Sequence, residues 1–282
     1  MSAPAANLDC GGRQRRPDVD DVSGKASNNQ CNGRVTGWAL TRRVKTARFP
    51  NGEYVTELSL PRKGRRNNAW LVVVEFAIVV ALFVADFKHH IFFSKTPYLF
   101  LLGWISLRWR GLGWRDVGLA RPQNWERTIT IGKLGGMGIE LMELFVTQPL
   151  LVKLFHKMPD LSELNGLRGS WKLLLLGLAL AWTLAAFGEE MVYRGYLMNR
   201  VAGLFSNPKV AWPISLIVVS FVFGLGHIDQ GITGQVENMI DGALLGVIFL
   251  ATGCNLWAAI VAHGLTDTID LVLLYLGKYP GV

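Results

Sequence analysis

The architecture of this chain follows from residues 171–200, which read WKLLLLGLALAWTLAAFGEEMVYRGYLMNR. The first part, Trp171–Phe187, is almost entirely apolar. A helix of this length, rising about 1.5 Å per residue, approaches the ~30 Å thickness of membrane hydrocarbon. Glu189, Glu190 and Arg194 follow directly, without a turn signal. Charged groups inside a bilayer are costly and are commonly functional. The stretch therefore predicts a membrane helix that carries a polar site.

Six other apolar runs have a similar character. At this length, each is a candidate membrane helix. They predict an all-α polytopic membrane bundle of about seven spans, with six and eight as the alternatives. The glycine pairs Gly132/Gly136 and Gly242/Gly246 are spaced for close helix contacts. The runs are Ala69–Phe87, Pro97–Trp109, Ile129–Phe155, Val210–Gly226, Gln235–Gly253 and Leu256–Leu276.

Charge divides the chain of 282 residues into two parts. The net charge is +8, but residues 1–68 hold 13 Lys/Arg and 6 Asp/Glu, so residues 69–282 carry only +1. We predict that residues 1–68 form a basic, largely disordered tail with a short strand-like stretch near Tyr54–Leu60, and that residues 69–282 form the transmembrane domain. The basic stretch at residues 62–66 lies directly before the first apolar run, which predicts that the N-terminus is cytoplasmic. The protein is therefore expected to be a multi-pass membrane protein, in the plasma membrane if the source is bacterial. The bilayer is thus a partner. No recognisable fold accompanies the charge, so nucleic acid is not an expected partner.

Three apolar spans in the second half carry side chains of catalytic type. The motifs are Glu189-Glu190 with Arg194, Phe223 with His227, and His263 with Asp267. Residues four apart share a helix face, so Glu190 and Arg194 can form an ion pair. Glu189 lies about 100° further around the helix and can face a cavity. One such residue would have a structural role by default, but the whole set together indicates a site.

Other intramembrane carboxylates have a structural interpretation. Glu75 is expected to face another helix or a span end. Glu140 and Glu143 lie three apart on one helix face, where they could pair with Lys133 or with another span.

The ordered motifs resemble the type II CAAX prenyl protease family of intramembrane endopeptidases, which includes bacteriocin-processing and self-immunity proteins. The family pattern, Glu-Glu-xxx-Arg, Phe-xxx-His and His-xxx-Asn/Asp, matches within residues 170–275. The resemblance implies a peptidase of the CAAX-processing type that acts on a membrane-anchored or lipidated peptide. It also implies a glutamate mechanism with no metal cofactor.

The motif residues can be given roles in peptide hydrolysis. Glu189 is expected to act as general base on a water that His227 also holds. His263 and Asp267 would face the developing oxyanion. Because an ionised aspartate cannot donate a hydrogen bond, Asp267 either is protonated or orients His263. The remaining three motif residues support the site: Glu190, Arg194 and Phe223.

Several alternatives remain open at the level of sequence. Glu189, His227 and His263 could instead hold a catalytic zinc, although no HExxH motif is present. The protein could be a catalytically silent membrane scaffold or a bacteriocin-immunity protein. A transporter or proton channel could also use intramembrane Glu, His and Asp, but no inverted repeat supports it.

Overall fold

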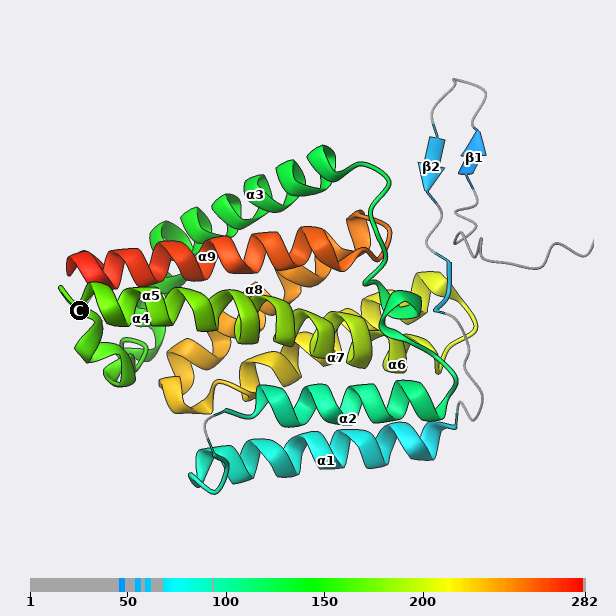
Figure 1. The fold of residues 1–282 in the computed structure, drawn as a ribbon, viewed down its shortest axis with the longest axis horizontal. Helices are drawn as coiled ribbons and strands as arrows, with labels where there is room; N and C mark the ends of the chain where they lie inside the picture. The colour runs from blue at the N-terminus through cyan, green and yellow to red at the C-terminus, as the bar shows by residue number, and fades with distance from the viewer. Residues whose placement is uncertain (1–45, 49–53, 57–58, 62–67, 93, 281–282) are drawn as a thin grey trace, which may run out of the picture. The chain divides into compact units, whose positions relative to one another are not determined.

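The computed structural model describes residues 46–48, 54–56, 59–61, 68–92 and 94–280. Figure 1 shows a helical bundle, and in the described residues the remaining regular structure is an antiparallel pair of short strands. The predicted all-α architecture is confirmed. The elements are β1 Thr46–Arg48, β2 Tyr54–Thr56, α1 Ala69–Phe87, α2 Thr96–Trp109, η1 Trp114–Val117, α3 Trp125–Met142, η2 Glu143–Thr147, α4 Gln148–Phe155, η3 Ser162–Leu167, α5 Trp171–Leu180, η4 Ala181–Glu189, η5 Met191–Leu197, α6 Met198–Ala202, α7 Pro208–Leu225, η6 Ile228–Gln230, α8 Gly231–Ala251 and α9 Leu256–Leu276.

Most of the predicted tail, residues 1–68, lies outside the described residues. Within it, β1 pairs with β2, with Ala47 opposite Val55. The strand-like stretch predicted at Tyr54–Leu60 thus coincides in part with β2.

Five of the seven predicted spans form helices that are long and apolar enough to cross a membrane. In the described residues these stretches are Ala69–Phe87, Trp171–Ala202, Pro208–Leu225, Ile228–Ala251 and Leu256–Leu276. The run at 97–109 forms α2, whose 14 residues give only about 21 Å of helix. The run at 129–155 is divided among α3, the π-helical segment η2 and α4, and it contains Lys133, Glu140 and Glu143. Shortness and polarity therefore separate these two runs from the other five.

Glycines allow α3 to pack against α9 and α7 to pack against α8. A Cβ atom at Gly132 would lie 2.8 Å from the carbonyl oxygen of Ala258, and one at Gly136 would lie 2.5 Å from that of Ala262. On α8, a Cβ atom at Gly242 would lie 3.1 Å from the Phe223 ring. The predicted close contacts at these glycine pairs are confirmed, including Gly246 against Leu216.

The loops gather at two opposite ends of the bundle. At one end, Leu256 N–H donates to the carbonyl of Gly118, which joins the loop before α3 to the α8–α9 turn. At the other end, Asp160 N–H donates to the carbonyl of Gln230, and Gly169 N–H donates to that of Tyr275. This second end, made of loops 156–170 and 226–230 and of residues 277–280, is where the polar site lies.

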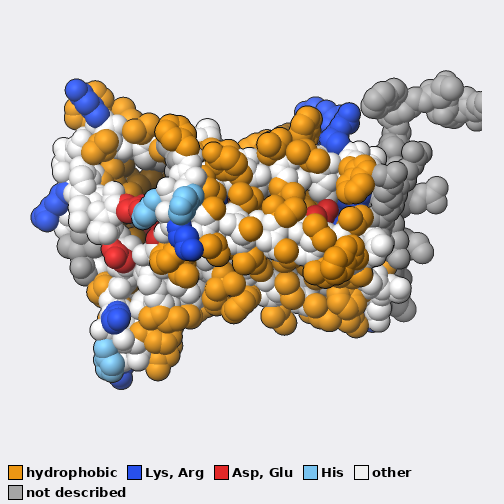
Figure 2. Space-filling view, turned by 90° about the horizontal axis from the view of Figure 1, so that it is seen from below, with side chains coloured by type: hydrophobic (Ala, Val, Ile, Leu, Met, Phe, Trp, Pro, Cys, Tyr) orange, Lys and Arg blue, Asp and Glu red, His pale blue; other side chains and the backbone are white. Residues whose placement is uncertain are grey.

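The inside of the bundle holds a buried ion pair, while its outside is apolar. Glu75 on α1 forms an ion pair with Arg200 and accepts a hydrogen bond of 2.5 Å from Ser106, as expected for a structural carboxylate facing other helices. Many large apolar side chains are exposed, for example Leu134, Phe145 and Ile217. Figure 2 shows apolar side chains over much of one face, with acidic and histidine side chains beside a hollow. An exposed apolar exterior of this kind suits contact with lipid.

Candidate active site

The motif residues of three spans converge on one cavity of about 360 Å³. Glu189 comes from the end of η4, His227 from the turn after α7, and His263 and Asp267 from α9. All four line the cavity, as does Phe223. Glu190 and Arg194 lie behind its wall, 0% and 1% exposed.

Helix geometry explains how the adjacent residues Glu189 and Glu190 face different parts of the protein. Glu190 separates two π-helical segments, η4 and η5, within the continuous helical stretch from Trp171 to Ala202. Such wide turns occur frequently at functional sites. Glu189 faces the cavity, whereas Glu190 faces the interior of the bundle.

Glu190 is the centre of a buried network. Its Oε1 atom accepts from Arg194 Nη1 at 2.6 Å and lies 2.9 Å from His263 Nδ1. Arg194 also donates to the carbonyl of Gly242 at 2.8 Å. The network thus connects the helix that carries Glu189 with α8 and α9. The predicted Glu190–Arg194 ion pair is present.

Phe223 fills the space between the charged groups and the histidines. Its ring centroid lies 4.7 Å from the Arg194 guanidinium carbon, 4.9 Å from the His227 ring and 6.1 Å from the His263 ring. Tyr193 packs edge-on against the same ring at 4.8 Å. Phe223 therefore fixes the relative positions of the cationic and imidazole side chains.

His227 has a defined orientation at the mouth of the site. Its Nδ1 lies 2.8 Å from the carbonyl oxygen of Phe223, which leaves Nε2 for the cavity. This histidine lies between two spans, and burial lowers its pKa, against an opposing contribution from Glu189. Nearby Lys95 lowers the pKa further. The neutral imidazole is therefore favoured, with Nε2 as an acceptor when Nδ1 carries the proton.

The carboxylates of Glu189 and Asp267 have partners from different elements. Thr96, at the start of α2, donates to Glu189 Oε1 at 3.4 Å. Thr96 is a site residue that no sequence motif marks, because nothing in its sequence neighbourhood relates α2 to Glu189. Asp267 Oδ1 lies 3.6 Å from His263 Nε2, so the two side chains pair along α9 as their spacing predicts.

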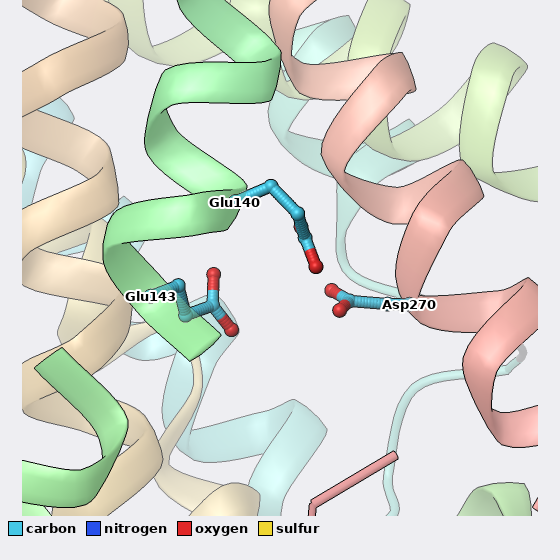
Figure 3. Close-up of side chains that lie close together, drawn as sticks. All are labelled: Glu140, Glu143 and Asp270. Carbon is cyan, nitrogen blue, oxygen red and sulfur yellow. The ribbon is translucent and has the colours of Figure 1, made fainter. Parts of the chain in front are cut away.

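The ligand atoms that suit a metal gather elsewhere in the cavity. In the residues described, the group whose ligand atoms all lie within 4.8 Å of one another is Glu140, Glu143 and Asp270, rather than Glu189, His227 and His263. Glu140 and Glu143 do not pair with Lys133, which is exposed; they face α9 instead. Figure 3 shows the carboxylates of Glu140 and Asp270 directed toward one another, with Glu143 beside them.

The fold and site define an integral membrane protein whose apolar helices enclose a carboxylate- and histidine-lined cavity. Residues 171–269, about a third of the chain, match the model of the protein family described as type II CAAX prenyl endopeptidase Rce1-like. The matched segment contains all three motifs, so the resemblance inferred from them is confirmed. The comparisons found no match among curated proteins and none among solved structures.

Proposed function

We propose that the protein is an intramembrane endopeptidase of the CAAX-processing type, in which Glu189 and His227 activate a water. The observation that carries the proposal is that Glu189, His227, His263 and Asp267, which come from three different parts of the fold, line one cavity. Peptide hydrolysis needs a base, a positioned water and stabilisation of an oxyanion, and this set can supply all three.

Glu189 is the proposed general base. Its side chain is 8% exposed, so it reaches the cavity while lying largely out of bulk water. The Thr96 hydroxyl occupies one lone pair of Oε1, which leaves Oε2 for the proton of the attacking water. His227, through Nε2, holds the same water.

His263 is the proposed group that faces the oxyanion. Its Nδ1 is held by Glu190, so the ring cannot rotate away from the cavity without losing that contact. The contact of 3.6 Å between Nε2 and Asp267 supports an orienting role for Asp267 rather than oxyanion donation. In this mechanism Asp267 orients the His263 ring, which faces the developing oxyanion.

The arrangement supports a mechanism without zinc. The ligand atoms of Glu189, His227 and His263 do not form a compact group in the described residues. Tetrahedral zinc sites need their ligands close to one ion.

Cleavage by purified protein tests the proposal. The full chain in lipid nanodiscs is incubated with peptides that carry a C-terminal lipidated cysteine motif, and with the unlipidated equivalents. We expect cleavage by the wild type, at most about one per cent of it by Glu189→Gln, and unchanged cleavage by Glu126→Gln, whose carboxylate is exposed on α3. Cleavage by Glu189→Gln at the wild-type rate would refute the role of Glu189. Loss of cleavage on chelation, with recovery on stoichiometric zinc, would refute the metal-free mechanism.

A further inference from the structure

The cavity continues beyond the catalytic set into a second group of carboxylates. Glu143, Glu237, Asp241 and Asp270 line it together with Glu189 and His227, and Glu140 adjoins them. They come from the α3–η2 boundary, from α8 and from α9. We call Glu140, Glu143, Glu237, Asp241 and Asp270 the acidic cluster. None of its members has a role in the proposed hydrolysis.

Three members have the geometry of ligands to a single ion. One oxygen each of Glu140, Glu143 and Asp270 lies within 4.8 Å of the other two, and the three side chains converge in Figure 3. Oxygens that bind one Ca²⁺ or Mg²⁺ lie about 2.0–2.6 Å from it, so two on opposite sides are separated by roughly 4–5 Å. The observed spacing therefore admits one cation between them.

The cluster also contains buried oxygens that no donor satisfies. Glu140 is 1% exposed, and in the described residues no lysine, arginine, hydroxyl or amide donates to its carboxylate oxygens; the group beside them is the carboxyl of Asp270. Glu237, outside the trio, is 4% exposed and lines the cavity with Oε1 unpartnered. Asp241 and Asp270 each have one unpartnered buried oxygen. Buried polar atoms nearly always have partners, so these atoms point to a ligand that supplies one.

The surroundings supply little positive charge. In the described part of the chain, none of the five carboxylates forms an ion pair with a lysine, arginine or histidine. Glu143 accepts from a neutral donor, the Tyr279 hydroxyl at 3.5 Å, which in turn accepts from Gln148. Unpaired buried carboxylates are costly, and a bound cation removes that cost.

We propose that Glu140, Glu143 and Asp270 bind one divalent cation, with Glu237 and Asp241 adding negative charge from α8. The donors are all oxygens, without thiolate or imidazole, which selects Mg²⁺, Ca²⁺ or Mn²⁺ over zinc or copper. The site is separate from Glu189 and from the zinc set considered above, and it does not depend on peptide hydrolysis. Its ion would link α3 to α9.

Ion binding by the full chain tests the site directly. Protein in nanodiscs of neutral lipid is treated with chelator and dialysed, and Mn²⁺ binding is followed by electron paramagnetic resonance. Mg²⁺ and Ca²⁺ are then measured by competition. We expect one saturable ion per chain and a rise in melting temperature on its addition. Absence of saturable binding of all three ions to folded wild type would overturn the proposal, and would leave protons shared between carboxyl groups as the explanation.

Variants then locate the ion. Glu140→Gln and Asp270→Asn should each weaken binding by about tenfold or more, since each removes one anionic ligand. Glu126→Gln and Glu189→Gln should bind as the wild type does. Each variant is first checked for folding by size exclusion and tryptophan fluorescence. Unchanged affinity in both cluster variants would overturn the assignment. If both variants fail to fold, Tyr279→Phe is tested instead, because it removes only the neutral hydroxyl that donates to Glu143. This variant should still bind one ion, but with a changed affinity. An unchanged affinity would overturn the assignment.

Discussion

His263 Nδ1 lies 2.9 Å from Oε1 of Glu190, the carboxylate oxygen that also binds Arg194. The Glu190 carboxylate thus contacts both His263, which takes part in the proposed hydrolysis, and the guanidinium of Arg194 on its own helix. This arrangement separates the two adjacent glutamates by role, since Glu189 faces the cavity and Glu190 holds the bundle together. A glutamate-to-glutamine substitution should therefore affect mainly stability at position 190 and mainly cleavage at position 189.

Glu190→Gln should destabilise the protein by about 3–5 kcal/mol, because it leaves the Arg194 guanidinium buried without its counter-charge. Glu189→Gln should change stability by less than about 1 kcal/mol while abolishing cleavage. Thermal unfolding in a single detergent, followed by tryptophan fluorescence, measures both. Equal melting temperatures for the two variants would contradict the separation.

Asp267→Asn should lower kcat by about tenfold or more with little change in KM, since the positioning of His263 is weakened while the peptide-binding surface remains. Asp267→Ala should lower kcat further. Steady-state kinetics on one peptide compares the two. A wild-type kcat in both variants would show that Asp267 does not act through His263.

Cleavage should have an acidic limb set by His227. Burial lowers the pKa of this residue below 6.5, so the ring stays neutral at neutral pH and becomes protonated only as the pH falls through that lowered value. Protonation removes the Nε2 acceptor, and kcat/KM should decline there. Because Lys95 contributes to the lowered pKa, Lys95→Met should move the acidic limb to higher pH. A limb that moves to lower pH in Lys95→Met would contradict this.

Two glycines of α3 form a matched pair for the α3–α9 contact. Gly136→Ala should cost about 1–3 kcal/mol, because its Cβ would lie 2.5 Å from the carbonyl oxygen of Ala262. Gly138→Ala meets nothing within 4 Å and should stabilise the protein by about 0.4–1 kcal/mol through helix propensity. Melting temperatures should therefore shift in opposite directions; a shift of equal sign would argue against the close contact.

The predicted cytoplasmic N-terminus places the cavity end on the opposite side of the membrane. The 203–207 turn belongs to the first end and Ser162 to the cavity end. In a cysteine-free background, a membrane-impermeant maleimide applied to intact cells should label Ser162→Cys and not Ser206→Cys. The reverse pattern would show that the N-terminus is outside.

The sequence predicted much of the fold because its signals are local. The bounds of α1 and α9 coincide with apolar runs, and the turn at Asn207 follows from its capping side chain and the proline after it. The motif spacing likewise predicted which residues share a helix face. All of these follow from residues within one or two turns of one another.

The parts that sequence reasoning missed depend on contacts between distant segments. His263 and Glu190 lie 73 positions apart in the chain, so their contact cannot be derived from spacing within one helix. Thr96 lies 93 positions from Glu189. Glu140 and Glu143 were expected to pair with Lys133 or with another span, and their own helix could not show which; the carboxylates beside them come from α8 and α9.

The acidic cluster also makes the charge of residues 69–282 unevenly distributed, although their net charge is only +1. Negative side chains concentrate in the cavity, while basic residues such as Lys95, Lys172 and Lys278 lie outside its lining. A low-dielectric cavity with walls of one sign concentrates its field at the opening. We expect it to act as an electrostatic filter that draws cationic peptide segments inward and turns away anionic lipid headgroups.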